Sequence, residues 1–382
     1  MRRVGRLLAF AVVASLVVGG LVVVFRGQLL RLSGVSFDIG TPGQTTLQLP
    51  QGVEAGVFAQ GLAGPRFMAF SPDGVLFVAD RDADRIVALP DRDRDGHADE
   101  TIVVGSGYGQ AHSLAFFDAA TILVPGRTTL YRVRLGPDLR EQARTVFYGD
   151  YPGDGAHTTR TVIIRDDGQV LLSVGSSCNV CEEADDRRAA ILAIPAEGGT
   201  ARVLMRGLRN AVGVTADPAT GAVWATDMGR DLLGDDTPPE TLYRVEDGAD
   251  AGWPRCHAGT LVDPDFGQRP SPFDGKVGCD GVVAPAATFQ AHSAPLALAF
   301  WGERAVIAFH GSWNRSSKVG YEVDWFPWSD GPAADPEPLA TGFLDGFTTE
   351  STGRPAGLVV GPDGALYVSD DKAGFVYRLV RD

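Results

Sequence analysis

Short apolar runs joined by turn signals recur along the chain. In "GLAGPRFMAFSPDGVLFVAD" (61–80), a Gly/Pro-rich entry leads into an apolar run, a Pro-Asp-Gly turn and a second run rich in Val and Ala. The segments "TGRPAGLVVGPDGALYVSDD" (352–371) and "GLRNAVGVTADPATGAVWATD" (207–227) have the same order. Apolar runs of this length that meet at an Asp-Gly turn are typical of β-hairpins. Each segment therefore predicts two antiparallel strands.

The hairpin unit occurs six times. "HTTRTVIIRDDGQVLLSVG" (157–175) is a fourth copy, and residues 110–126 and 292–311 are two more with altered turns. Further short apolar runs, such as "RIVALP", "TLYRVRL" and "FVYRLV", follow the hairpins. Three or four strands per unit, repeated at near-even spacing, predict an all-β, six-bladed β-propeller. A pair of unrelated β-sandwiches is the alternative.

Composition supports a globular protein and narrows its partners. Of the 382 residues, 44% are hydrophobic and 21% charged, which is enough for a sizeable core. The net charge of -14 argues against nucleic acid as a partner, because binding to phosphate backbones needs a basic surface. An acidic surface is compatible with bound cations or a small neutral substrate.

The N-terminus differs from the rest of the chain. "MRRVGRLLAFAVVASLVVGGLVVVF" has a basic start and an uncharged apolar run over residues 7–25, about the length of a membrane-spanning helix. We expect residues 1–30 to be a membrane anchor or signal segment, 31–48 a linker, and 49–382 the propeller. An uncleaved anchor is favoured over a cleaved signal peptide. Either one predicts a protein on the periplasmic or extracellular side.

Export makes the four cysteines interpretable. Cys178 and Cys181 form a CxxC motif, and Cys256 and Cys279 bracket a loop rich in Pro, Gly and Asp. In an oxidising compartment, two disulfides paired in that order are expected in preference to a zinc site. A disulfide that braces the loop at 178–181 is likewise favoured over a redox-active dithiol.

The propeller geometry gathers cationic and polar residues at one face. In each blade, the start of the first strand and the end of the antiparallel second strand lie on the same face. This places eight side chains around one mouth of the channel and predicts an anionic ligand there, with a histidine beside it. Capping of strand ends in contact with solvent is the alternative. The eight residues are His157, Arg209, Asn210, His292, His310, Arg315, Arg354 and Lys372.

Eight motifs, in order, resemble one known family. They are "AHTTRTV", "GSSCNVC", "GLRNAVG", "GDDTPPETL", "AGWPRC", "HSAPLALAF", "HGSWNR" and "GRPAGL". From about Leu49 to Leu379 the chain resembles the pyrroloquinoline-quinone-dependent glucose/sorbosone dehydrogenases. The resemblance implies a six-bladed propeller that binds pyrroloquinoline quinone (PQQ) and calcium at the top of the channel and oxidises a sugar or sugar-aldehyde carbinol.

The resemblance also assigns roles around the cofactor. His157 matches the catalytic base, for which a neutral imidazole is suited. Arg209 and Asn210 match a cofactor-contacting pair, and Arg209 is also expected to stabilise developing negative charge. Arg354 matches another cofactor arginine, and Arg315 lies near a position where some members have lysine. His310, which adjoins Arg315, and Lys372 are also expected to contact the cofactor.

The loop "TDMGRDLLGDDTPPE" matches the family's calcium loop. The resemblance assigns the carbonyls of Gly229 and Arg230 to calcium, with Asp231 or Asp235 as further oxygen donors. Some members have proline where this chain has Arg230. Members also commonly have proline or glutamine where this chain has Ala211 and Val212, which leaves the substrate open.

A second calcium site is predicted in "DRDRDGHADE" (91–100). Asp91, Asp93, Asp95 and Asp99 surround Gly96 at a spacing that can wrap the ion. The bidentate acid expected at the twelfth position is missing, because Ile102 stands there. A solvated acidic turn is the alternative.

Three functional classes remain at this stage. The first is an exported quinoprotein oxidoreductase that passes electrons to an external quinone or cytochrome, since the chain has no CxxCH haem motif. The second is a calcium-dependent lactonase or esterase, which the cationic mouth disfavours. The third is a non-catalytic propeller that binds a partner.

Overall fold

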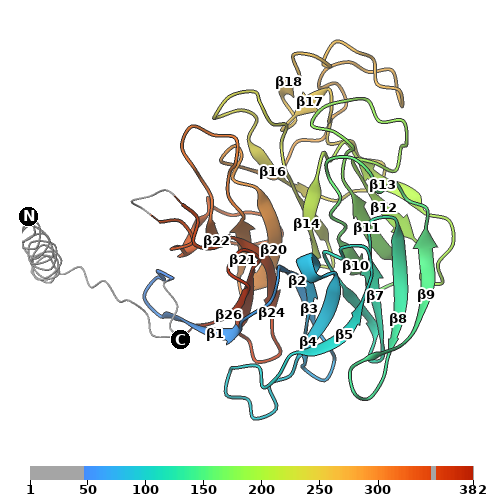
Figure 1. Cartoon of the computed structure of the whole chain (residues 1–382). Helices are drawn as coiled ribbons and strands as arrows, with labels where there is room; N and C mark the ends of the chain where they lie inside the picture. The colour runs from blue at the N-terminus through green and yellow to red at the C-terminus, as the bar shows by residue number, and fades with distance from the viewer. Residues whose placement is uncertain (1–46, 346–349, 382) are drawn as a thin grey trace, which may run out of the picture. The chain divides into compact units, whose positions relative to one another are not determined.

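The computed structural model describes residues 47–345 and 350–381, and these form six four-stranded antiparallel sheets (Figure 1). The innermost strands of neighbouring sheets contact one another around a closed ring. The predicted six-bladed β-propeller is therefore confirmed. The expected anchor at 1–30 and nearly all of the linker lie outside the described residues. Within the described part, no helix is long and apolar enough to cross a membrane.

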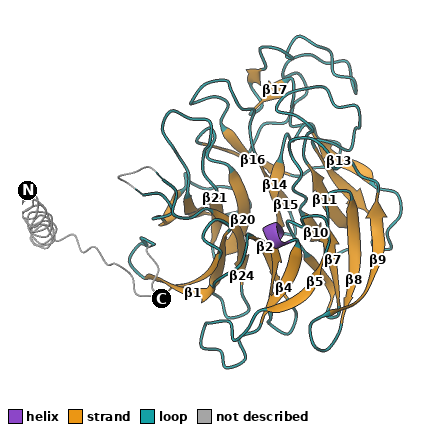
Figure 2. Cartoon of the chain, viewed as in Figure 1, coloured by secondary structure: helices purple, strands orange, loops and turns teal. Residues whose placement is uncertain are grey.

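The first three blades follow the chain in order. Their strands are β2 (Pro65–Phe70), β3 (Leu76–Asp80), β4 (Arg85–Leu89) and β5 (Ile102–Ser106); β6 (Ala115–Asp118), β7 (Thr121–Pro125), β8 (Thr129–Leu135) and β9 (Glu141–Gly149); β10 (Val162–Ile164), β11 (Val170–Val174), β12 (Ala190–Ile194) and β13 (Arg202–Arg206). In the described residues the only helix is the 3-10 turn η1 (Arg81–Ala83), purple in Figure 2.

The last three blades complete the ring. Their strands are β14 (Ala211–Ala216), β15 (Val223–Asp227), β16 (Glu240–Arg244) and β19 (Ala287–Phe289); β20 (Pro295–Trp301), β21 (Arg304–Phe309), β22 (Glu322–Pro327) and β23 (Glu337–Ala340); β24 (Pro355–Val360), β25 (Leu366–Asp370), β26 (Phe375–Arg381) and β1 (Val53–Ala59). The outer strand of blade six is thus β1, the first strand of the described chain. It pairs with the last strand, β26, from Val53 opposite Arg381 to Ala59 opposite Val376. This pairing closes the ring.

The hydrophobic core is divided among the six contacts between neighbouring blades. The cluster with Phe77 and Ile122 joins blades one and two, and the cluster with Trp224 and Ile307 joins blades four and five. Each sheet therefore buries both faces. This explains why the second strands, such as β11, read as continuous apolar runs instead of alternating apolar and polar residues.

Buried hydroxyls tie the inner strands of adjacent blades together. Thr226 Oγ1 accepts a hydrogen bond from the Gly213 amide at 3.0 Å in its own blade and donates to the Pro295 carbonyl of blade five at 2.7 Å. Ser369 makes the equivalent contact in blade six, where its hydroxyl donates to the Arg66 carbonyl of blade one at 2.7 Å. Such bonds satisfy backbone groups that the strand irregularities leave out of the ladder.

An insertion rises from blade four between β16 and β19, at the top of Figure 1. It contains the short pair β17 (Cys256–His257) and β18 (Leu261–Val262), which the repeat pattern did not predict. Both predicted disulfides are present, Cys178–Cys181 and Cys256–Cys279. The second one closes the insertion.

Candidate functional site

Of the eight residues predicted at the mouth, five lie in the loops just before inner strands, and His310, Arg315 and Lys372 follow the second strands β21 and β25. Arg209 and Asn210 directly precede β14, and Arg354 directly precedes β24. His157 lies five residues before β10, so the first strand of this blade begins later than the hairpin segment 157–175 predicted. The carboxylate of Asp227, at the end of the second strand, accepts the Arg209 and Asn210 amides at 3.1 and 2.7 Å. At this end of the blade, the Asp227 side chain therefore accepts hydrogen bonds that the backbone of a neighbouring strand would otherwise accept.

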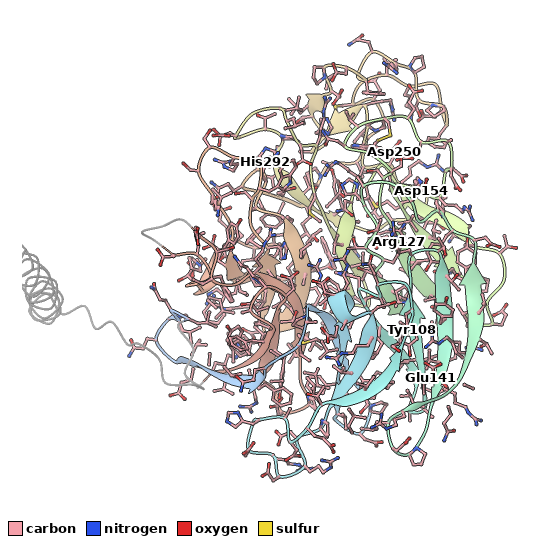
Figure 3. All side chains as sticks on the ribbon, in the orientation of Figure 1. Tyr108, Arg127, Glu141, Asp154, Asp250 and His292 are labelled. Carbon is pink, nitrogen blue, oxygen red and sulfur yellow. A yellow bond between two sulfur atoms is a disulfide. The ribbon has the colours of Figure 1, made fainter. Side chains whose placement is uncertain are left out.

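These loops surround a cavity of about 610 Å³, here called the central cavity, at the inner ends of blades three to six. Figure 3 labels one lining residue, His292, near the upper end of the molecule. Six of the eight residues predicted to ring one mouth line it. The lining comprises His157, Arg209, Asn210, Met228, Gly229, Asp231, Glu240, His292, Ala294, Leu296, His310, Gly311, Trp313, Asn314 and Arg354.

A second cavity of about 560 Å³ lies between residues 182–189 and the insertion. Two of its three arginines are paired, Arg188 with Asp154 and Arg255 with Asp250, and the third, Arg206, stacks on Phe273. We assign the chemistry to the central cavity, because it holds the histidines and the residues predicted for the cofactor.

The hydrogen bonds of His157 fix its tautomer. Its Nδ1 lies 2.8 Å from Ser176 Oγ and 3.1 Å from the Ser176 carbonyl oxygen. The Ser176 hydroxyl already donates its proton to the Cys178 carbonyl at 2.7 Å. Both groups must therefore accept from His157, so Nδ1 carries the proton and Nε2 is an unprotonated acceptor. Burial, together with the Arg209 guanidinium, lowers the pKa of His157 to about 3 and keeps the ring neutral.

Arg209 is held on all sides. Its Nε donates to the Asn179 carbonyl at 2.9 Å, and its Nη1 donates to the Gly229 carbonyl at 2.7 Å. Its Nη2 lies 2.9 Å from Asn179 Oδ1 and 2.6 Å from Asp231 Oδ2. The guanidinium is thus fixed in a nearly buried position where it borders the central cavity.

Two carboxyl groups that the sequence analysis did not place at the mouth lie in or beneath the cavity. Glu240 accepts the Gly229 amide at 2.6 Å, and burial raises its pKa to about 8. Burial also raises the pKa of Asp227 to about 7. Asp231 lines the cavity as well and pairs with Arg209. The mouth therefore carries less positive charge than expected, because the Asp231 carboxylate compensates the charge of Arg209.

His310 belongs to a second charged network. Its Nε2 lies 3.0 and 2.9 Å from the two carboxylate oxygens of Asp371, which also pairs with Arg66. Burial lowers the pKa of His310 to about 4. Burial alone would raise the pKa of Asp371, but the hydrogen bond with His310 and the charge of Arg66 lower it below its usual range. His310 thus donates from Nε2, and its Nδ1 is left as an acceptor.

The remaining predicted cofactor residues differ in position. Arg354 donates to two carbonyls, those of His310 at 3.0 Å and Gly311 at 2.8 Å, and lines the cavity. Arg315 instead contacts the loop of the predicted calcium site, where it donates to the Asp235 carbonyl. Lys372 is exposed and donates to Ser351.

The loop predicted to hold calcium brings only some of its donors to the cavity. Gly229 and Asp231 line it. The side chain of Arg230 points to the insertion, where it pairs with Asp263 and Asp265. Asp235 lies on the Arg315 side and accepts the Ser316 amide at 3.1 Å.

Three of the four acids predicted for the second calcium site lie together. Asp91, Asp93 and Asp95 each bring a carboxylate oxygen to within 4.8 Å of the others. The Asp91 carboxylate accepts the amides of Asp95 and Gly96, both at 3.1 Å. Asp99 accepts the Arg92 amide at 2.7 Å and is not part of this group.

Several residues of the site were missed from the sequence. Asn179 and Asp371 had a signal, since Asn179 stands between the paired cysteines and Asp371 stands in the "SDDK" segment at the end of a second strand. Trp313 and Asn314 stand in the "HGSWNR" motif, from which only the histidine and the arginine were chosen. Glu240 had a signal as well, since it ends the "TDMGRDLLGDDTPPE" loop and stands in the "GDDTPPETL" motif.

Curated proteins similar to this chain include two sugar dehydrogenases. A pyrroloquinoline quinone-dependent pyranose dehydrogenase of Coprinopsis cinerea is 29% identical over 290 residues, which are 59% of this chain and 40% of that protein. A pyrroloquinoline quinone-dependent sugar dehydrogenase of Hypocrea jecorina is 27% identical over 389 residues, 86% of this chain and 88% of that protein. An uncharacterized protein of Borreliella burgdorferi is 28% identical, and the match spans 57% of its length. The chain thus spans about half the length of the first relatives.

Solved structures share the fold. A Trichoderma reesei enzyme of carbohydrate-active family AA12 superposes with a TM-score of 0.76 at 23% identity, covering 91% of this chain and 100% of that one. The holo form of the PQQ domain of pyranose dehydrogenase from Coprinopsis cinerea gives 0.75 at 25% identity, covering 89% and 98%. The profile of the TrAA12-like family matches residues 47–258 and 259–382. The chain therefore belongs to the TrAA12-like family.

Proposed function

We propose that this protein is a dehydrogenase that oxidises a sugar or sugar-aldehyde carbinol by hydride transfer to PQQ bound in the central cavity, with His157 as the general base. One observation carries the proposal. His157 presents an unprotonated Nε2 in a cavity that also exposes Arg209, Asn210 and Arg354. Relatives whose names state PQQ dependence support the choice of cofactor.

The residues of the cavity fit the cofactor. PQQ is planar and carries three carboxylates, which suit planar guanidinium donors. The Arg354 side chain donates to two uncharged carbonyls, which leaves its charge uncompensated by them. A buried acceptor, Asn314 Oδ1, has no partner among the described residues. A Cβ atom at Gly175 would come within 2.6 Å of His157 Cβ and 2.8 Å of Asn210 Oδ1, so glycine keeps this wall open.

The chain's own residues handle the proton. When bound, the quinone supplies the acceptor for the hydride. The substrate hydroxyl donates its proton to His157 Nε2, while the Ser176 contacts hold the ring through Nδ1. Arg209 favours negative charge on the substrate oxygen. An anionic ligand beside Arg209 offsets the effect of the guanidinium and raises the pKa of His157, which makes the ring a better base.

The sugar would rest against Trp313. Its side chain is 73% exposed although it lines the cavity, so an indole face is available at the entrance. Indole faces pack well against the C–H groups of a pyranose ring. A bound sugar would also remove apolar surface of Trp313 from water, which is favourable. The neighbouring amide of Asn314 can bond to hydroxyls.

Calcium would be held beside the cofactor by the carbonyls of Gly229 and Arg230 and by the Asp231 carboxylate, with Asp235 farther out. Oxygen donors of this kind suit Ca²⁺, which would polarise a carbonyl as a Lewis acid. The Gly229 carbonyl accepts from Arg209 at 2.7 Å, so the same guanidinium and ion would share this oxygen. Asp91, Asp93 and Asp95 would hold a separate, structural calcium ion.

Export, a membrane anchor at residues 1–30 and an external quinone or cytochrome as electron acceptor complete the proposal. The two disulfides support an oxidising compartment.

A metal-dependent hydrolase is the second candidate, favoured by Asp231, Glu240 and Asn314 at the same cavity. Two observations weigh against it. Asp231 is already paired with Arg209, and the raised pKa of Glu240 keeps that group protonated at neutral pH.

The test separates the candidates. The full chain is mixed with PQQ and Ca²⁺, and absorbance is followed while a panel of aldoses and sorbosone is added. Reduction of the bound quinone by at least one sugar supports the dehydrogenase. Hydrolysis of lactones or esters without quinone, and no sugar-dependent reduction, would replace it with the hydrolase.

A further inference from the structure

The loop after β11 contains a four-residue turn, Cys178–Cys181, closed by a disulfide. The loop that contains this turn contacts both groups that the proposed reaction depends on. Asn179, inside the turn, contacts Arg209, and Ser176, two residues before the turn, contacts His157. A single short segment therefore connects the base and the cation of the cavity.

Asn179 uses its carbonyl and both polar atoms of its side chain. Its carbonyl accepts from Arg209 Nε at 2.9 Å and from the Trp253 indole at 3.3 Å. Its Oδ1 accepts from Arg209 Nη2 at 2.9 Å and from the Asp231 amide at 2.8 Å, while its Nδ2 donates to the Asp231 carbonyl at 3.0 Å. Arg209 is thus gripped by both the backbone and the side chain of one residue, which fixes the plane of the guanidinium.

Ser176 anchors the other end. Its hydroxyl donates to the Cys178 carbonyl, which belongs to the disulfide-closed turn, and accepts from His157 Nδ1. Its amide donates to the Arg209 carbonyl at 2.8 Å. The ring of His157 and the backbone of Arg209 are therefore both attached to Ser176, whose hydroxyl is in turn bonded to Cys178.

We propose that the disulfide-closed turn Cys178–Cys181 is a positioning element that sets the Arg209 guanidinium against the His157 ring, with Asn179 as the positioning residue. The consequence for catalysis rests on the proposed function, whereas the positioning itself does not. A cross-link three residues long removes conformational freedom from Asn179 before any ligand binds. The backbone carbonyl and the side-chain oxygen of Asn179 can both accept from one guanidinium only while the backbone of Asn179 is held in one conformation.

The electrostatic consequence can be measured on His157. Burial and then Arg209 lower its pKa, Arg160 lowers it further, and the hydrogen bond with Ser176 raises it. If Asn179 no longer holds Arg209, the guanidinium keeps only the Asp231 carboxylate and the carbonyls of Met228 and Gly229 as partners, and it can move away from His157. Its effect on His157 then weakens, and the pKa of the ring rises.

The first experiment uses Asn179→Ala in the full chain without cofactor. The pH titration of His157 is followed by NMR of labelled histidine, with Val180→Ala in the same turn as the matched control. We expect the pKa of His157 to rise by about half a unit or more in Asn179→Ala, a size typical of a displaced neighbouring charge. In Val180→Ala we expect no change. Equal pKa values in the two variants would overturn the proposal.

The second experiment asks whether Asn179 acts through Arg209. With the cofactor bound, we expect Asn179→Ala to lower kcat by roughly 10- to 100-fold with a smaller change in KM, as for a misplaced catalytic group. In an Arg209→Ala background the same substitution should have almost no further effect. Additive losses would overturn the proposal. If no sugar is oxidised by the wild-type chain, the proposed function fails, but the NMR titration still tests the positioning.

The disulfide itself is tested by Cys178→Ser/Cys181→Ser against Cys256→Ser/Cys279→Ser. The first pair should reproduce the higher pKa of His157, and the second pair, which opens only the insertion, should leave it unchanged. Circular dichroism shows whether each variant folds. If the Cys178→Ser/Cys181→Ser variant does not fold, the pKa of His157 in Asn179→Ala, which keeps both disulfides, tests the proposal.

Discussion

Burial decides which side chains of the central cavity carry charge. His157 and His310 are neutral because burial lowers their pKa values to about 3 and about 4, and Glu240 is neutral at pH 7 because burial raises its pKa to about 8. Arg209 keeps its charge but shares it with Asp231. Arg354 is the lining arginine whose side-chain bonds go to carbonyls alone.

Arg354 should therefore contribute strongly to the binding of an anionic cofactor. Replacing it with alanine removes a charge-assisted hydrogen bond of about 1.5 to 3 kcal/mol, so PQQ should bind roughly 10- to 150-fold more weakly. Isothermal titration of the Ca²⁺-loaded protein with PQQ measures this. Arg304→Ala is the control, because Arg304 stacks on Trp325 in blade five instead of lining the cavity. An unchanged Kd in Arg354→Ala would contradict the assignment.

Sequence reasoning found the residue types of the site better than their partners. His157, Arg209, Asn210 and Arg354 could be aligned because they stand at the same place in repeated units. Their partners could not be found in this way. Asn179 and Asp371 lie in loops whose path depends on the tertiary structure, and no periodicity reports a loop path.

Between strands and blades, buried hydroxyls form hydrogen bonds with backbone groups that the strand pairing leaves unpaired. Thr226→Val keeps the shape but leaves the Gly213 amide and the Pro295 carbonyl without their partner. We expect a loss of about 1 to 3 kcal/mol in the free energy of unfolding, measured by urea denaturation. Thr215→Val, on the partly exposed end of β14, is the control and should change stability by less than about 0.5 kcal/mol. Equal effects would refute a special role for the hydroxyl.

Strand β22 buries an acid that should make stability depend on pH. Burial, reinforced by Glu322, raises the pKa of Asp324 to about 7, and its Oδ1 has no partner in the described part of the chain. The unfolded chain loses this proton near pH 4, before the folded chain does. The contribution of Asp324 to stability is therefore complete below pH 4 and is lost as pH rises towards 7, by about 1.4 kcal/mol per pH unit.

The substitution Asp324→Asn removes this ionisation. The free energy of unfolding of the variant, minus that of the wild type, should grow between pH 4.5 and 7, and urea unfolding at several pH values measures it. A difference that stays constant over this range would show that Asp324 ionises normally in the folded protein.

At the scale of the whole propeller, one strand closes the ring. Strand β1 comes from the opposite end of the described chain and covers the edge of β26. The six hairpin units were predicted because each is local, whereas β1 carries no hairpin signal and pairs across more than 300 residues. The insertion of blade four was missed for a related reason, since its loops depend on a disulfide and on ion pairs such as Arg230–Asp263.

A chain that begins at Gln60 should lose cooperative stability. It lacks β1, so β26 becomes an unprotected edge and the core of Phe58 and Ala59 is opened. We expect a lower Tm and oligomers in size-exclusion chromatography, compared with a chain that begins at Leu47. Equal Tm values for the two chains would show that three strands suffice in blade six.

If His157 takes the proton while the cavity holds the cofactor, the single-turnover reduction of bound PQQ by an aldose depends on the His157 side chain. In His157→Gln we expect PQQ to bind within a few-fold of the wild-type Kd. We expect its reduction to be slower by about 10²- to 10⁴-fold, the range for a lost general base. Reduction at the wild-type rate in this variant would contradict the account.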